Sequence, residues 1–262
     1  MNSKSTNNFF NFSERADLTA IIKSDESIFY KDLFTRANKL SSSLLDFGIN
    51  KNDYIPLLIE DNSQFIKTTI ALWHLGAVPV PLNTKLINEE VYSIVDDYDL
   101  KFLVTDKELP SGRFQKDFKI IQLNEIQFNK NEFRRLTFPV LEDEAVVIFT
   151  SGISGTPKGV VHTFSSLINS IENGSAILNH KENDRWLASL PFYHIGGFQI
   201  ICRSLYYGCS IIIPESLQTK QLADAILTNK PTHLSLVSTQ LERLIHQKVK
   251  PKESLMVTLI GG

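Results

Sequence analysis

The sequence predicts an α/β protein with mainly parallel sheets that are covered by helices on both faces. Two observations predict this class. Short apolar runs alternate along the chain with longer amphipathic segments, and glycine or proline separates most of them. Such alternation requires crossover connections between parallel strands. At 262 residues, of which 42% are hydrophobic, the chain can bury a core of this kind.

Seven segments are predicted as helices because their apolar residues recur at helical spacing. One face of the first helix carries six apolar residues: Leu33, Phe34, Ala37, Leu40, Leu44 and Leu45. Gly48 stops the first helix and Gly76 the second, which Asn62 or Ser63 caps at its start. The predicted helices span residues 31–47, 62–75, 88–97, 165–177, 197–207, 217–228 and 239–247.

Nine short apolar runs are predicted as strands. They span residues 54–59, 78–82, 100–105, 119–123, 145–149, 186–190, 210–213, 233–237 and 257–260. Pro79 and Pro81 place the second strand at a sheet edge or end. The Asn- and Ser-rich first dozen residues are predicted to be frayed. We expect two α/β subdomains, residues 1–144 and 145–262.

Composition excludes several classes of function. The formal net charge of −2 argues against binding to nucleic acid or to an anionic membrane. No apolar run is long enough to span a bilayer, and the polar start lacks the apolar region of a secretory leader. Cys202 and Cys209 do not have zinc-site spacing and are predicted to be buried, reduced thiols. Reduced thiols indicate a cytoplasmic protein.

Several other conspicuous residues are interpreted as structural. Trp73 and Trp186 stand at core positions of a helix and a strand. His162 and His233 have no partner visible in the sequence. The four acidic residues at the ends of the third helix are predicted to form a solvated face: Glu89, Glu90, Asp96 and Asp97.

The segment from Thr150 to Gly159 combines glycines with hydroxyl side chains and a lysine, and we expect it to follow a buried strand and precede a helix. Its glycines allow the backbone to approach a ligand, and its N–H groups can form an anion nest. The predicted nucleotide-binding residues are Thr150, Ser151, Gly152, Ser154, Gly155, Thr156 and Lys158. On spacing alone, a solvated turn is the alternative. The segment is not a Walker A loop, because Pro157 precedes the lysine and Gly159 follows it.

The string TSGISGTPKGV at residues 150–160 closely resembles the signature of the adenylate-forming superfamily of acyl-CoA synthetases, luciferases and nonribosomal adenylation domains. Four further stretches resemble the same family: DFGINKND at 46–53, LGAVPVPLN at 75–83, LPFYHIGG at 190–197 and LIGG at 259–262. Within the family, LPFYHIGG followed by CRSLYYG is most similar to the o-succinylbenzoate–CoA ligases of menaquinone synthesis.

The resemblance implies the fold of the family's large N-terminal domain, here incomplete. It implies a reaction in which ATP, with Mg²⁺, activates a small carboxylic acid to an acyl-adenylate, and CoA then takes the acyl group. The implied substrate-binding residues are His194, Gly196, Gly197, Arg203, Gly261 and Gly262. Arg203 is offered as a partner for a second carboxylate of the acid. We expect no metal site made by the chain itself, and the oligomeric state stays open.

Two departures from the family pattern bear on activity. Ile153 stands where the family has a hydroxyl residue, so one possible phosphate donor is missing. The family's catalytic lysine lies beyond Gly262, and the chain alone is therefore predicted not to complete the reaction. Three other functions stay open: ligation of a different short-chain, medium-chain or aryl acid, loading of a carrier protein, and nucleotide binding without turnover.

Overall fold

The computed structural model describes residues 6–11, 13–24, 26–109, 118–127, 138–150 and 157–261. The chain forms two compact units. One contains residues 34–166, and the other contains residues 1–33 together with residues 167–262. This division by contacts differs from the predicted boundary after residue 144. The reason is that two N-terminal strands pair into the sheet built by the later part of the chain.

The unit of residues 34–166 is built on a parallel four-stranded sheet in the order β4-β3-β5-β6. These strands are β3 (Tyr54–Leu58), β4 (Val78–Pro81), β5 (Phe102–Thr105) and β6 (Lys119–Gln122), and a short 3-10 helix, η2 (Leu123–Glu125), follows β6. The strand that contains Pro79 and Pro81 lies at the edge, as predicted, because an edge strand does not need every backbone N–H. The helices are α1 (Tyr30–Asp46), which begins in the other unit, α2 (Asn62–Leu75) and α3 (Asn88–Asp97).

The core of this unit packs α3 and a two-stranded hairpin against the parallel sheet. The hairpin consists of β7 (Glu144–Thr150) and β8 (Lys158–Thr163), which pair in antiparallel fashion. Val147 of β7 joins one apolar cluster with Val80 of β4 and Val91 of α3. Trp73 of α2 is 1% exposed, and its Nε1–H donates to the Ala145 carbonyl at 2.7 Å. This hydrogen bond ties α2 to the first residues of β7.

The other unit contains a six-stranded sheet in the order β12-β11-β9-β10-β1-β2, in which only the β1–β2 pair is antiparallel. Its strands are β1 (Thr19–Ile22), β2 (Ser27–Phe29), β9 (Arg185–Leu187), β10 (Ser210–Ile212), β11 (His233–Val237) and β12 (Val257–Gly261). Its helices are α4 (Phe164–Leu178), which begins in the unit of residues 34–166, α5 (Ile195–Tyr207), α6 (Thr219–Asn229) and α7 (Ser238–His246).

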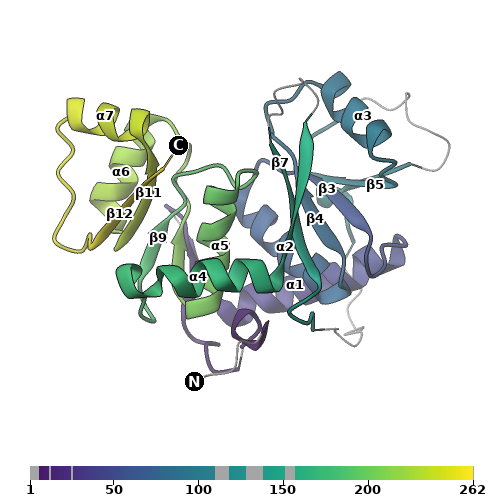
Figure 1. The fold of residues 1–262 in the computed structure, drawn as a ribbon, viewed down its shortest axis with the longest axis horizontal. Coiled ribbons are helices and arrows are strands. Elements are labelled where there is room, and N and C mark those ends of the chain that lie inside the picture. Colours follow the sequence, from purple (N-terminus) through teal and green to yellow (C-terminus); the bar gives the residue numbers. More distant parts are fainter. Residues whose placement is uncertain are drawn as a thin grey trace. The chain divides into compact units, whose positions relative to one another are not determined.

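Both faces of this sheet are covered, as predicted. On one face, α6 and α7 pack on the inward side chains of β11, Leu234 and Leu236 (Figure 1). The alternate residue His233 points to the other face, where its Nε2–H donates to the Leu178 carbonyl of α4 at 2.8 Å. His233 is thus a hydrogen-bonded core residue, as expected from the sequence.

Three sequence predictions need correction. The first dozen residues are not all frayed: Thr6–Phe9 form a 3-10 helix, η1, and Phe9 is buried against Tyr206 with ring centroids 5.5 Å apart. Strands β1 and β2 were not predicted from the sequence. The phosphate-loop segment is followed by a strand, β8, and not directly by a helix.

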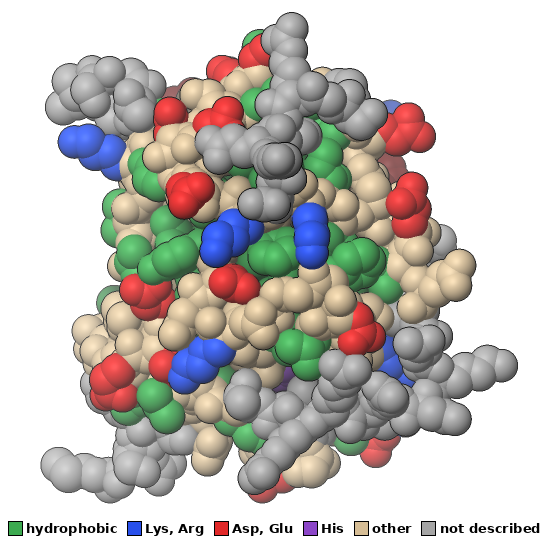
Figure 2. Space-filling view, turned by 90° about the vertical axis from the view of Figure 1, so that its right-hand side faces the viewer, with side chains coloured by type: hydrophobic (Ala, Val, Ile, Leu, Met, Phe, Trp, Pro, Cys, Tyr) green, Lys and Arg blue, Asp and Glu red, His purple; other side chains and the backbone are tan. Residues whose placement is uncertain are grey.

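The predictions for Trp186, the two thiols and the acidic residues of α3 are confirmed. Trp186 and the thiols of Cys202 and Cys209 are fully buried, and burial raises the pKa of Cys209 to about 12. The four acidic residues of α3 are exposed. None of the described helices is long and apolar enough to cross a membrane. On the face shown in Figure 2, acidic and basic side chains are interspersed, with hydrophobic side chains exposed between them.

Candidate functional site

The β7–β8 hairpin holds the two ends of the predicted phosphate loop. Its register pairs Phe149 with Gly159 and Thr150 with Lys158. The structure does not describe residues 151–156, and the two strands are paired as far as Thr150 on one side and Lys158 on the other. Among the predicted loop residues, Ser151, Gly152, Ser154, Gly155 and Thr156 lie outside the described residues, as does Ile153. Strand β8 separates this segment from α4, which begins only at Phe164.

Lys158 is exposed at the start of β8. Its carbonyl accepts a hydrogen bond from the Thr150 hydroxyl at 3.3 Å, which joins the two arms of the hairpin side by side. In the part of the chain that the structure describes, no carboxylate forms an ion pair with the Lys158 ammonium. An exposed ammonium without an acidic partner is suited to a phosphate ligand.

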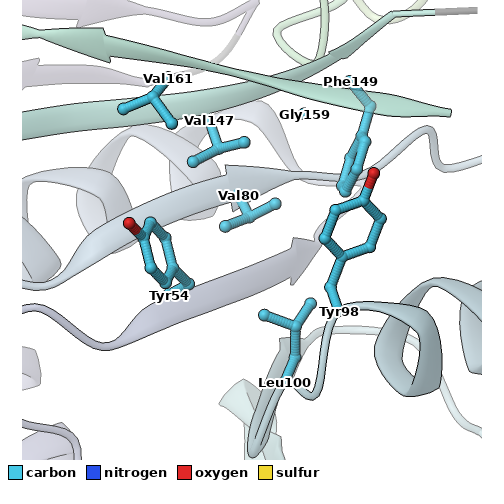
Figure 3. Close-up of a pocket in the computed structure, with 8 residues that line it drawn as sticks. All are labelled: Tyr54, Val80, Tyr98, Leu100, Val147, Phe149, Gly159 and Val161. Carbon is cyan, nitrogen blue, oxygen red and sulfur yellow. The ribbon is translucent and has the colours of Figure 1, made fainter. Parts of the chain in front are cut away.

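An apolar pocket of about 190 Å³ lies beside this hairpin, within the same unit (Figure 3). Its lining comes from β7, β8, the neighbouring strands β3 and β4, and the turn after α3. The lining residues are Tyr54, Val80, Tyr98, Leu100, Val147, Phe149, Gly159 and Val161.

Two tyrosines stand at opposite ends of this pocket (Figure 3). One is hydrogen-bonded to the first residue of β7, and the other to the residue just before β8. The Tyr54 hydroxyl donates to Glu144 Oε2 at 2.6 Å, which raises the pKa of Tyr54 to about 12. The Tyr98 hydroxyl donates to the Pro157 carbonyl at 2.7 Å. Sequence reasoning missed both tyrosines, because no local pattern links the start of β3 or the end of α3 to the hairpin.

The second group of predicted residues lies at the carboxyl edge of the six-stranded sheet. His194 follows β9 and serves as the N-cap of α5, with extended backbone angles and no side-chain capping bond. The centroid of its ring lies 4.6 Å from that of the Tyr193 ring. His194 is exposed, and its partial burial lowers its pKa. Gly261 ends β12 opposite Val237 of β11, at the same edge of the sheet. Gly262 lies outside the described residues.

Of the two glycines in this turn, Gly197 is the one whose position requires glycine. A Cβ atom on Gly197 would lie 2.0 Å from the Pro191 carbonyl oxygen, so only glycine allows the first turn of α5 to approach this backbone. A Cβ on Gly196 would meet only the end of the Leu190 side chain, at 3.2 Å. Gly197 is therefore a packing residue that shapes the turn carrying His194.

Arg203 lies apart from this group. It follows His194 by nine residues on α5, which corresponds to about 13 Å along the helix axis. Its guanidinium stacks over Trp186 at 5.5 Å, and burial lowers the pKa of Arg203. His180 stacks on Trp186, Tyr207 and His233 in the same cluster. Since His233 begins β11, the cluster lies toward the amino ends of the parallel strands, and the structure does not bring Arg203 together with His194.

The described residues contain no group of three His, Cys, Asp or Glu side chains that could hold a metal ion. Mg²⁺ in ATP-dependent enzymes is held largely by substrate phosphates and water.

Several known proteins resemble this chain over nearly its whole length. The 2-succinylbenzoate–CoA ligase of Bacillus subtilis (strain 168) is 27% identical over 254 residues, which cover 95% of this chain and 52% of the relative. The ligase of the same name from Bacillus cereus (strain Q1) is 30% identical over 251 residues, covering 94% and 51%. The chain thus spans about half the length of the curated relatives it matches.

Solved structures agree with the fold. Unliganded o-succinylbenzoate coenzyme A synthetase (MenE) from Bacillus subtilis superimposes with a TM-score of 0.89 at 24% identity, over 99% of this chain and 56% of that one. The same synthetase in complex with ATP and magnesium ion gives 0.88 at 25% identity, over 99% and 55%. The predicted fold class is therefore confirmed. The model of the family described as AMP-binding enzyme matches residues 10–262, and the chain belongs to that family.

Proposed function

We propose that this chain is the nucleotide- and acid-binding part of an acid–CoA ligase, with a 2-succinylbenzoate as the acid. The observation that carries the proposal is the hairpin, which presents the exposed Lys158 beside Thr150 at the two ends of a Gly-, Ser- and Thr-rich segment. The similarity to ligases of that name over 95% of the chain supports the choice of acid.

The reaction would proceed in two steps. A carboxylate oxygen of the acid attacks the α-phosphorus of ATP, the bond to the β-phosphate oxygen breaks, and pyrophosphate leaves. The thiolate of CoA then attacks the acyl carbon, and AMP leaves. In the first step the protein's part is to align the reactants and to stabilise charge on the polyphosphate.

We assign the polyphosphate to Lys158, the Thr150 hydroxyl, and the N–H and hydroxyl groups of Ser151, Gly152, Ser154, Gly155 and Thr156. Bound Mg²⁺ would neutralise part of the phosphate charge. The acid is assigned to the carboxyl edge of the six-stranded sheet, with His194, Gly196 and Gly261 nearest to it, because ligands of parallel sheets bind at that edge. Arg203 is left out of this assignment because it lies about 13 Å along α5 from His194. We further propose a cytoplasmic location, where thiols stay reduced.

Equilibrium binding of ATP and Mg²⁺ to the 262-residue chain tests the proposal. A charged hydrogen bond is worth about 1.5–3 kcal/mol, so Lys158→Ala should weaken ATP binding at least about ten-fold while AMP binding changes little. Lys101→Ala is the matched control, because Lys101 is an exposed lysine of the same unit outside the hairpin. A wild-type chain that binds no ATP would refute the assignment.

ATP–pyrophosphate exchange with 2-succinylbenzoate separates the alternatives. Exchange with this acid, and not with other aryl or aliphatic acids, supports the proposed substrate. Binding of both ATP and 2-succinylbenzoate without exchange is the result expected for the incomplete ligase chain, whereas binding of ATP without binding of any acid indicates a nucleotide-binding protein without turnover.

A further inference from the structure

Tyr98 contacts both arms of the β7–β8 hairpin at its loop end. It stands directly after α3, and its ring meets the Phe149 ring edge-on, with centroids 5.1 Å apart and planes at 65°. Its hydroxyl donates to the Pro157 carbonyl at 2.7 Å. Phe149 lies one residue before Thr150, and Pro157 directly precedes Lys158. Figure 3 shows the Tyr98 ring reaching from the turn after α3 toward Phe149.

We propose that Tyr98 is a positioning residue for phosphate binding, because it sets the direction in which β8 presents Lys158. This inference rests on the proposed function, since it concerns the same ATP-binding end of the hairpin. Tyr98 itself contacts neither substrate nor reacting atoms in this scheme. It acts through Pro157 on one arm and through Phe149 on the other.

The bond to Pro157 matters because proline has no backbone N–H. The carbonyl is the only main-chain group through which Pro157 can be hydrogen-bonded, and Tyr98 uses that group. The other side-chain contact described at this end, from the Thr150 hydroxyl to the Lys158 carbonyl, is longer at 3.3 Å. The tyrosine therefore supplies the shorter of these two contacts at the base of the loop.

Phe149 is held between Tyr98 and the opposite strand. A Cβ atom on Gly159 would lie 2.9 Å from Val147 Cγ1 and 3.5 Å from Phe149 Cε1, so these side chains already cover the glycine closely. Movement of Tyr98 would free the outer side of the Phe149 ring, and the strand end could then shift relative to β8.

Tyr54 provides a matched comparison. It lines the same pocket at the other end and is 39% exposed, while Tyr98 is 41% exposed. Its hydroxyl also makes one short hydrogen bond, to Glu144 at the start of β7, far along the strand from Thr150. Tyr54→Phe thus removes a similar bond from the same pocket without touching the loop end of the hairpin.

The test measures binding of ATP with Mg²⁺ and of AMP, by calorimetry on the 262-residue chain, for wild type, Tyr98→Phe, Tyr98→Leu and Tyr54→Phe. AMP lacks the β- and γ-phosphates. An ordinary hydrogen bond is worth about 1 kcal/mol, so Tyr98→Phe should weaken ATP binding about five-fold and leave AMP binding unchanged. Tyr98→Leu, which also removes the ring contact, should weaken ATP binding further. Tyr54→Phe should leave the ratio of the two affinities at its wild-type value.

The melting temperature of each variant serves as the folding check. If Tyr98→Phe melts like wild type but keeps the wild-type ratio of ATP to AMP affinity, Tyr98 has no positioning role. The same conclusion follows if both tyrosine variants change the ratio equally. A wild-type chain that does not bind ATP overturns the proposed function together with this inference. A wild-type chain that binds ATP, with a Tyr98→Phe variant that keeps the wild-type ratio of ATP to AMP affinity, overturns this inference alone.

Discussion

Replacement of Gly197 by alanine should destabilise the unit that contains α5 and distort the turn before it. A Cβ at this position would lie 2.0 Å from the Pro191 carbonyl oxygen, 2.6 Å from the Pro191 carbonyl carbon and 2.8 Å from the Leu190 carbonyl oxygen. All three obstacles are backbone atoms, which cannot turn aside as a side chain can. Ordinary contact begins near 3.4 Å, so the nearest pair must separate by 3.4 − 2.0, about 1.4 Å.

The magnitude follows from two opposing effects. Overpacking of this kind costs about 1–3 kcal/mol or more. Alanine gains at most about 1 kcal/mol over glycine in a helix. Because a clash of 2.0 Å with backbone lies at the severe end, we expect a net loss of about 2 kcal/mol. For a chain of this length, that loss lowers the melting temperature by about 4–8 °C.

Gly196→Ala is the control, since its Cβ would meet only Leu190 Cδ1 at 3.2 Å, at the end of a flexible side chain. Thermal unfolding followed by intrinsic fluorescence reports both units, because the chain has two tryptophans, Trp73 in one unit and Trp186 in the other. We expect Gly196→Ala to melt at or above the wild-type temperature. Equal melting temperatures for the two variants would show that the close approach at Gly197 does not constrain the turn.

Two further predictions concern stability. Trp73→Phe removes the buried hydrogen bond to the Ala145 carbonyl and should cost about 2–4 kcal/mol in thermal or urea denaturation. Trp186→Phe should cost less, because Trp186 Nε1 has no hydrogen-bond partner among the described residues, and equal losses would contradict this account. Desolvation, with His233 and Arg203 nearby, lowers the pKa of His180 from 6.5 to about 4. Between pH 4 and pH 6.5 the folded state therefore binds fewer protons than the unfolded state. Stability should fall as pH drops from about 6.5 toward 4, His180→Phe should flatten that fall, and an unchanged pH profile of the melting temperature would refute the role of His180.

The helices were predicted closely because their signals are local. The apolar spacing that predicts α1 lies within that helix, and Gly76, which ends α2, directly follows it. Even so, the N-cap of α2 is Asp61, which neighbours the predicted Asn62 and Ser63, because its carboxylate accepts from the backbone N–H groups of Ser63 and Gln64. Such a choice between adjacent polar residues depends on which side chain reaches the free N–H groups.

The missed strands depend on distant partners. Strand β1 is short and pairs Ile21 with Ile211, a residue far along the chain. Strand β8 exists because β7 offers it an antiparallel partner, in a register that pairs Thr150 with Lys158. The same holds for the site: the motif around Lys158 was visible in the sequence, whereas Tyr98, which is hydrogen-bonded to the neighbouring Pro157, was not.

The sequence by itself determined the class of fold and the family, because periodicity and a long motif are properties of neighbouring residues. Tertiary structure alone decided that Tyr98 meets Phe149 and Pro157, that Gly197 packs on Pro191, and that Arg203 lies on Trp186 away from His194. These contacts join residues from different elements. Their partners are chosen by how helices and sheets pack, and no local pattern contains that information.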